Sequence, residues 1–101
     1  MKRKAYKISN QALIDLEQIW LYTFENWSIE QADRYYNLLI SEMEYVSQNQ
    51  ESGKSMNHIK NGYRASKVKS HLIFYKTSSE SEIEIIRILH ERMDIENRLK
   101  E

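Results

Sequence analysis

The fold is decided by residues 62–89, which run GYRASKVKSHLIFYKTSSESEIEIIRIL. Three segments of this stretch are extended in character and rich in β-branched or aromatic residues, and short polar turns separate them. We therefore predict three strands, at about 63–69, 70–76 and 82–89, that form an antiparallel meander. The later two strands carry apolar residues at neighbouring positions, such as Leu72 with Ile73 and Ile85 with Ile86. Both faces of the sheet should therefore contact apolar groups.

Two amphipathic helices are predicted before the meander. Ser9 or Asn10 can cap the first helix, and the capping-box sequence Ser28–Gln31 can begin the second. Almost no loop separates the two helices, so they should form an antiparallel hairpin whose apolar faces meet each other and the sheet. The predicted faces are Leu13, Leu16, Trp20, Thr23 and Trp27 in the first helix, and Ile29, Ala32, Tyr36, Leu39, Met43 and Val46 in the second.

The remaining segments complete an α+β fold. Residues 4–9 alternate and can form a short N-terminal strand, residues 50–61 are a polar loop, and residues 91–100 are expected to be a short C-terminal helix. Because the hairpin can cover only one face of the sheet, this last helix should lie near the other face or give way there to a partner. A chain of 101 residues fits one domain, which we place at residues 1–101.

Composition and charge disfavour several classes of protein. The chain has no cysteine, which removes disulfides and thiolate chemistry and suggests the reducing cytoplasm. No apolar run approaches the roughly 20 residues of a membrane span. The net charge is zero, yet residues 52–79 carry six basic and no acidic side chains. This segment could contact DNA or receive an acidic partner, and the sequence leaves both possibilities open.

Metal and nucleotide sites find little support in the sequence. The three histidines, His58, His71 and His90, lack the helical spacing or the cysteine partners of a recognised zinc site. Gly53-Lys54-Ser55 resembles the end of a phosphate-binding loop, but Gln48 stands where that motif needs a second glycine. We therefore expect no metal, no cofactor and no small-molecule substrate.

Several local sequences, together with the order of elements, resemble the ParE branch of the RelE/ParE superfamily of bacterial toxins. The most specific match is Arg87–His90 followed by Arg92–Asp94, and Gly62–Arg64 and Ser70–Tyr75 are also similar. Ser28 stands where the family more often has glycine. The first helix and the corner after it contribute Ser9, Ala12, Asp15, Leu16, Ile19, Tyr22, Trp27, Gln31 and Ala32.

The resemblance implies a toxin that is neutralised by a ParD-type antitoxin and that poisons DNA gyrase by trapping its cleaved-DNA intermediate. Toxins of this type are not enzymes themselves. RelE-type relatives use the same fold to cut mRNA in the ribosomal A site, so fold alone cannot choose between the two activities. A third hypothesis is a member that has lost toxicity and persists in an antitoxin complex.

Polar residues of the sheet are candidates under either mechanism. A nuclease would need a base, an acid and cations, for which the chain offers Arg64, Lys67, His71, Tyr75, Arg87 and His90. We favour packing or solvated roles for most of these, and expect Arg87, Arg92 and Met93–Asp94 to matter most in docking on gyrase. The candidates for target or partner binding are Arg64, His71, Tyr75, Arg87, His90, Arg92, Met93 and Asp94, and those for antitoxin contact are Tyr22, Phe24 and Tyr35.

Overall fold

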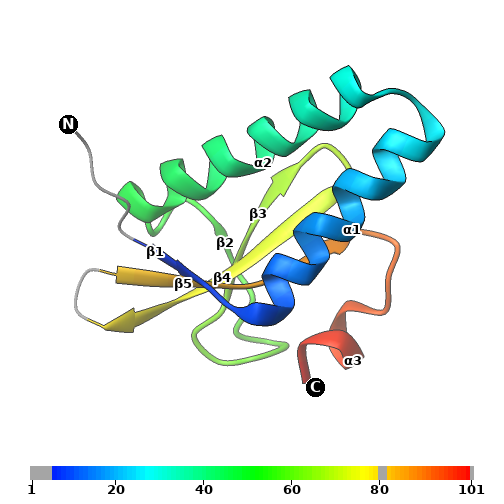
Figure 1. The fold of residues 1–101 in the computed structure, drawn as a ribbon. Coiled ribbons are helices and arrows are strands. Elements are labelled where there is room, and N and C mark those ends of the chain that lie inside the picture. The colour runs from blue at the N-terminus through cyan, green and yellow to red at the C-terminus, as the bar shows by residue number, and fades with distance from the viewer. Residues whose placement is uncertain (1–5, 80–81, 101) are drawn as a thin grey trace.

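The computed structural model describes residues 6–79 and 82–100, so Lys4 and Ala5 of the predicted first strand lie outside the described residues. A helical hairpin crosses one face of a sheet, and a short helix lies on the other side (Figure 1). This α+β arrangement agrees with the prediction. The elements are β1 (Tyr6–Ile8), α1 (Asn10–Asn26), α2 (Ile29–Gln48), β2 (Lys54–Ser55), β3 (Arg64–Val68), β4 (His71–Ser79), β5 (Glu82–His90) and α3 (Ile95–Lys100).

Both helices of the hairpin begin where the sequence predicts. The Ser9 side chain accepts a hydrogen bond of 3.0 Å from the backbone N–H of Ala12, and Ser28 accepts one of 3.1 Å from the N–H of Gln31. Each serine thereby satisfies one of the free donors at a helix start. The Ser9 hydroxyl also donates to the carbonyl of Ile86 at 2.8 Å, which ties the start of α1 to β5.

The sheet contains the predicted meander and is extended at both edges. Its strand order is β1-β5-β4-β3-β2, in which β1 runs parallel to β5 and the other neighbours are antiparallel. The prediction of an unbroken polar loop at 50–61 was wrong at β2, where Lys54 and Ser55 pair with Ala65 and Arg64. The predicted turn at 77–81 was too long, because β4 continues to Ser79. Pairing across the sheet, which a local pattern does not contain, makes these residues strands.

The core between hairpin and sheet corrects the predicted helical faces. Leu39, Met43 and Val46 are fully buried as predicted, and Leu16 is buried in α1. Leu13, however, is 48% exposed, and Trp27, Ile29 and Tyr36 are also exposed. The reason is that packing against the sheet sets the rotation of each helix. The prediction had assumed that contact with the other helix would bury as much of each apolar face as contact with the sheet. The buried residues of α1 are Ala12, Leu16 and Thr23.

The opposite face of the sheet is covered by α3 and by the loop before β3. Tyr63, Phe74, Leu89 and Leu99 form a second buried cluster there, so the expectation of apolar contacts on both faces is confirmed. The Lys60 Nζ donates to the Leu99 carbonyl at 3.1 Å, which holds the loop and α3 together. No helix in the described part of the chain has the length and apolar character needed to cross a membrane.

Candidate functional site

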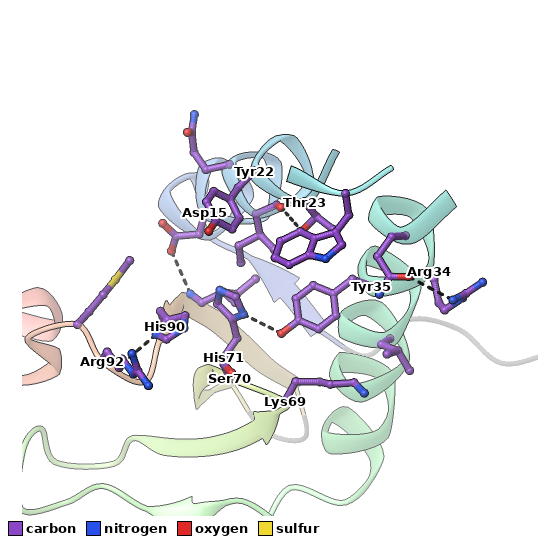
Figure 2. A pocket seen from close by; sticks show the side chains of 17 residues that line it. Asp15, Tyr22, Thr23, Arg34, Tyr35, Lys69, Ser70, His71, His90 and Arg92 are labelled. Carbon is purple, nitrogen blue, oxygen red and sulfur yellow. Dashed lines mark hydrogen bonds between the residues drawn. The ribbon is translucent and has the colours of Figure 1, made fainter. Parts of the chain in front are cut away.

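An open groove of about 950 Å³ lies between the hairpin and one end of the sheet. Figure 2 shows side chains from α1, α2 and the sheet pointing toward this space. We call it the groove. Its lining residues are Asp15, Gln18, Ile19, Tyr22, Thr23, Trp27, Gln31, Arg34, Tyr35, Leu38, Lys69, Ser70, His71, Ile88, His90, Arg92 and Met93.

The walls of the groove on the hairpin side are largely apolar. Tyr22 and Trp27 at the end of α1 are 61% and 67% exposed, and their rings contact each other edge to face with centroids 6.2 Å apart. Leu38 of α2 is also exposed. Large apolar side chains left open on one surface commonly mark a place of contact with another macromolecule.

A tight turn brings the polar end of the groove together. Lys69 and Ser70 connect β3 to β4, with Val68 paired to His71 across the turn. Lys69 has a φ of 56°, the left-handed conformation that such two-residue turns demand at one of their positions. His71 at the start of β4 pairs with His90 at the end of β5, so both imidazoles lie at the same end of the sheet.

Hydrogen bonds fix the orientation of both rings. The Tyr35 hydroxyl donates to the Val68 carbonyl at 3.0 Å and lies 2.7 Å from His71 Nδ1. Since a hydroxyl has one proton, His71 must donate from Nδ1 to Tyr35, which leaves its Nε2 as an acceptor. His90 has the opposite arrangement, because its Nδ1 accepts from the backbone N–H of Arg92 at 3.1 Å.

Electrostatics keep His71 neutral at ordinary pH. Burial, and then the neighbouring His90, lower the pKa of His71 to about 4, against a smaller opposing effect of Glu91. The two rings meet edge to face with centroids 5.2 Å apart, so protonating one disfavours a charge on the other. Burial also raises the pKa of the Tyr35 hydroxyl. His71 and Tyr35 are therefore a pair of neutral hydrogen-bonding groups.

Arg87, one of the predicted binding residues, contributes to a contact beneath the groove. Its Nε lies 2.8 Å from Asp15 Oδ2 and its Nη2 lies 3.1 Å from Asp15 Oδ1, while the N–H of Ile88 donates to Asp15 Oδ2 at 3.0 Å. We call this arrangement the clasp. The side chains of Arg87 and Asp15 are only 10% and 11% exposed. The clasp fastens α1 to β5, and burial disfavours a direct contact of Arg87 with a target.

Tyr75 and Arg64 lie away from the groove and hold the polar loop to the sheet. The Tyr75 hydroxyl donates to the Gln50 carbonyl at 2.9 Å and accepts from the N–H of Gly53 at 3.0 Å. Arg64 Nη1 donates to the Gly53 carbonyl at 2.7 Å. Burial is the main cause that raises the pKa of the Tyr75 hydroxyl. These two candidates therefore have structural partners.

The other predicted residues divide between the groove and its surroundings. Tyr22, Tyr35, His71, His90, Arg92 and Met93 all line it. Phe24 does not, and stacks instead on Trp20 with ring centroids 5.3 Å apart. Asp94 accepts hydrogen bonds from Asn97 at the start of α3, and Lys67 is paired with Glu91 at 3.0 Å.

Several lining residues were not among the candidates, including Trp27, Leu38, Arg34 and Lys69. Trp27 was assigned to the buried helical face, and Lys69 was visible only as part of the acid-free segment. Among the described residues, no three His, Cys, Asp or Glu side chains gather in a way that could hold a metal ion.

Comparisons with known proteins show what the chain is similar to. A family model described as the ParE toxin of a type II toxin–antitoxin system, parDE, matches residues 6–95. Toxin ParE1 of Mycobacterium tuberculosis is 34% identical over 94 residues, which is 93% of this chain and 96% of that protein. Toxin ParE1 of Caulobacter vibrioides is 34% identical over 91 residues, 90% of this chain and 93% of that protein.

A solved structure shares the fold. A chain of the chromosomal ParDE TA system from P. aeruginosa matches with a TM-score of 0.73 at 21% sequence identity. The match covers 85% of this chain and 94% of that one. The hairpin, the sheet and their connections are thus an arrangement found in other proteins.

Proposed function

Because the chain belongs to the ParE toxin family of type II toxin–antitoxin systems, we propose that it acts by binding: it inhibits DNA gyrase and is neutralised by a ParD-type antitoxin. The groove is the observation that carries the antitoxin half of the proposal. Inhibition of gyrase rests on what the family resemblance implies. Its place of action would be the cytoplasm, where gyrase and its DNA are found.

The chemistry of the groove suits an amphipathic peptide. Tyr22, Trp27 and Leu38 offer exposed apolar surface on the hairpin, and helices with one apolar face commonly dock in such grooves. Lys69 and Arg92 add positive charge at the sheet end. An antitoxin segment with an apolar stripe and acidic residues would match both features.

The burial and hydrogen bonds of two nuclease candidates favour a binding function over catalysis. Tyr75 is 1% exposed and hydrogen-bonded to the polar loop, and Arg87 is held in the clasp. A metal-free nuclease would need such groups free to reach the phosphate and its leaving group. The one observation in favour of the rival activity is that His71 and His90 line an open groove together with Arg92.

A paired assay on one preparation tests the proposal. The purified chain should trap gyrase-linked double-strand breaks in supercoiled DNA and leave ribosome-bound mRNA uncut. The double variant His71→Gln with His90→Gln should leave breaks by a binding-type toxin largely unchanged, but would abolish mRNA cleavage by a nuclease. Cuts in the A site without gyrase-linked breaks would refute the proposal. The absence of both activities would favour the hypothesis of a non-toxic family member held in an antitoxin complex.

The antitoxin is tested by co-expression with the small reading frame beside the gene. A ParD-type product should copurify with the chain and suppress the gyrase-linked breaks. A specific stable complex should bury more than about 1,000 Å² in total. If the chain inhibits gyrase but does not bind that product, the proposal of a ParD-type antitoxin is refuted and the proposal of gyrase inhibition stands.

A further inference from the structure

The sheet end of the groove has an excess of positive and proton-accepting groups. Lys69, His71, His90 and Arg92 line it, and they come from the β3–β4 turn and from the end of β5. Among the described lining residues the one carboxylate is Asp15, which Arg87 and the N–H of Ile88 already engage. These lining cations therefore have no unengaged carboxylate beside them among the lining residues.

The two carboxylates near the imidazoles are both held by other groups. Asp15 of α1 belongs to the clasp, and Glu91 pairs with Lys67 of β3 at 3.0 Å. The hydrogen bond and charge of Lys67, and more weakly His90 and Arg92, hold the pKa of Glu91 below its usual range. From α2, the Tyr35 hydroxyl contacts His71. Arg34 of the same helix also lines the groove and donates to Gln31 at 3.2 Å.

The arrangement favours a peptide over a nucleic acid. Two of the three lining cations, Lys69 and Arg92, lie at the sheet end. The third, Arg34, donates to Gln31 on α2, and the rest of the hairpin side is largely apolar through Tyr22, Trp27 and Leu38. A nucleic-acid strand carries a phosphate at every nucleotide and is usually met by cations along the whole length of a groove. A peptide with one acidic side chain beside apolar ones has the matching distribution.

An acid entering this end would weaken the effects that keep His71 neutral. Burial, and then the electrostatic effect of His90, oppose protonation of His71, and the carboxylate of Glu91 favours it more weakly. A second carboxylate at close range favours the imidazolium, and also gives the hydrogen-bonded ring an ionic partner. Binding of the acid and uptake of a proton should therefore be coupled.

We infer that the sheet end of the groove is a carboxylate subsite, in which Lys69 and Arg92 attract an acidic side chain of the peptide partner, and the bound carboxylate favours protonation of the neighbouring His71. The inference rests on the proposed function in that the antitoxin would supply this side chain. The subsite itself belongs to the isolated chain. It can therefore be tested without a partner.

The test is an NMR titration of the imidazole C–H signals with formate as the carboxylate probe and chloride at equal ionic strength, about 0.1 M, as reference. The titration midpoint of His71 should rise by about 0.5 to 1 pH unit in formate relative to chloride. His58, exposed in the loop before β3, is the internal control and should have the same midpoint in both salts. Equal midpoints for His71 in the two salts, or an equal rise at His58, would overturn the subsite.

Charge variants locate the effect. Lys69→Gln and Arg92→Gln change exposed side chains and should each reduce the formate-dependent rise at His71 by half or more. Lys54→Gln removes an exposed lysine on β2, which does not line the groove, and should leave the rise unchanged. A rise that survives both groove variants would overturn the roles of Lys69 and Arg92. A chain that traps gyrase but shows no formate effect would lose the subsite and keep the proposed function.

Discussion

Two polar clusters at the same end of the sheet differ in how completely their hydrogen-bonding and charged groups are satisfied within the molecule. In the clasp, Asp15 receives two hydrogen bonds from Arg87 and one from the backbone of Ile88. In the groove, His71 and His90 are oriented by Tyr35 and by the Arg92 backbone, but both line an open space. Arg87 and His90 lie three residues apart on one strand and were both candidates for binding, yet Arg87 is held in the clasp and His90 lines the groove. Residue type and position in the sequence therefore do not reveal the role of such a residue. The completeness of its internal partners does.

Breaking the clasp should have the largest effect on stability. Arg87→Met would leave the carboxylate of Asp15 buried without its cation, and such a change costs about 3 to 5 kcal/mol of unfolding free energy. Urea denaturation measures the difference. The double variant Asp15→Leu with Arg87→Met should recover a large part of the loss, because two apolar side chains replace the pair. No recovery in the double variant would mean that the clasp contributes more than the pairing of two charges.

The corrected helical faces predict unequal costs for two leucines of the hairpin. Leu39→Ala removes a fully buried side chain and should cost about 2 to 5 kcal/mol. Leu13→Ala removes an exposed one and should change stability by about 0.5 kcal/mol or less. Thermal and urea unfolding of both variants compare them directly. Equal losses would mean that the sheet does not set the rotation of α1.

The Tyr75 hydroxyl should matter for the polar loop. Tyr75→Phe removes the acceptor of the buried Gly53 N–H and should cost about 1 to 3 kcal/mol. Tyr45→Phe, at an exposed tyrosine of α2, is the matched control and should be close to neutral. Gly53→Ala should also destabilise, because the added Cβ would lie 2.9 Å from the Tyr75 ring carbons Cε1 and Cζ. Wild-type stability for Tyr75→Phe would contradict the role of the hydroxyl.

The pH dependence of stability should carry the signature of His71. Its folded pKa of about 4 lies below the ordinary value of 6.5, so the unfolded chain binds more protons between these two values. The contribution of His71 is complete above about pH 6.5 and is lost as the pH falls toward 4. His71→Gln should flatten this part of the profile by about 1 to 2 kcal/mol, since the ring is partly open to water. His58→Gln is the control, and an identical profile in wild type and His71→Gln would refute the assignment.

The walls of the groove should show the smallest effect on stability and a large one on binding. Trp27→Ser changes a side chain that is 67% exposed, so stability should move by about 0.5 kcal/mol or less. Affinity for the antitoxin should fall tenfold or more, as at other central aromatic contacts. Tyr45→Ser, an exposed aromatic residue outside the groove, should alter neither quantity. Calorimetric titration with the antitoxin measures the affinity. Wild-type affinity for Trp27→Ser would show that the groove takes no part in binding.

Much of the candidate site could be anticipated, but its division of roles could not. Six of the proposed contact residues line the groove, among them His71, His90 and Arg92. Arg64, Tyr75 and Arg87 belonged to the same candidate set but are engaged in hydrogen bonds to the fold. Their partners, Gly53, Gln50 and Asp15, are 11, 25 and 72 residues away in sequence. No local pattern identifies such pairs.

The sequence by itself determined the elements and the α+β order. The caps at Ser9 and Ser28, the two helical periodicities and the β-branched runs are local signals, and each acts within a few residues. The tertiary structure decided the rotation of α1, the edge strand at Lys54–Ser55 and the separation of the clasp from the groove. These depend on which distant surfaces meet, because burial and hydrogen-bond completion are properties of the assembled molecule and not of any segment.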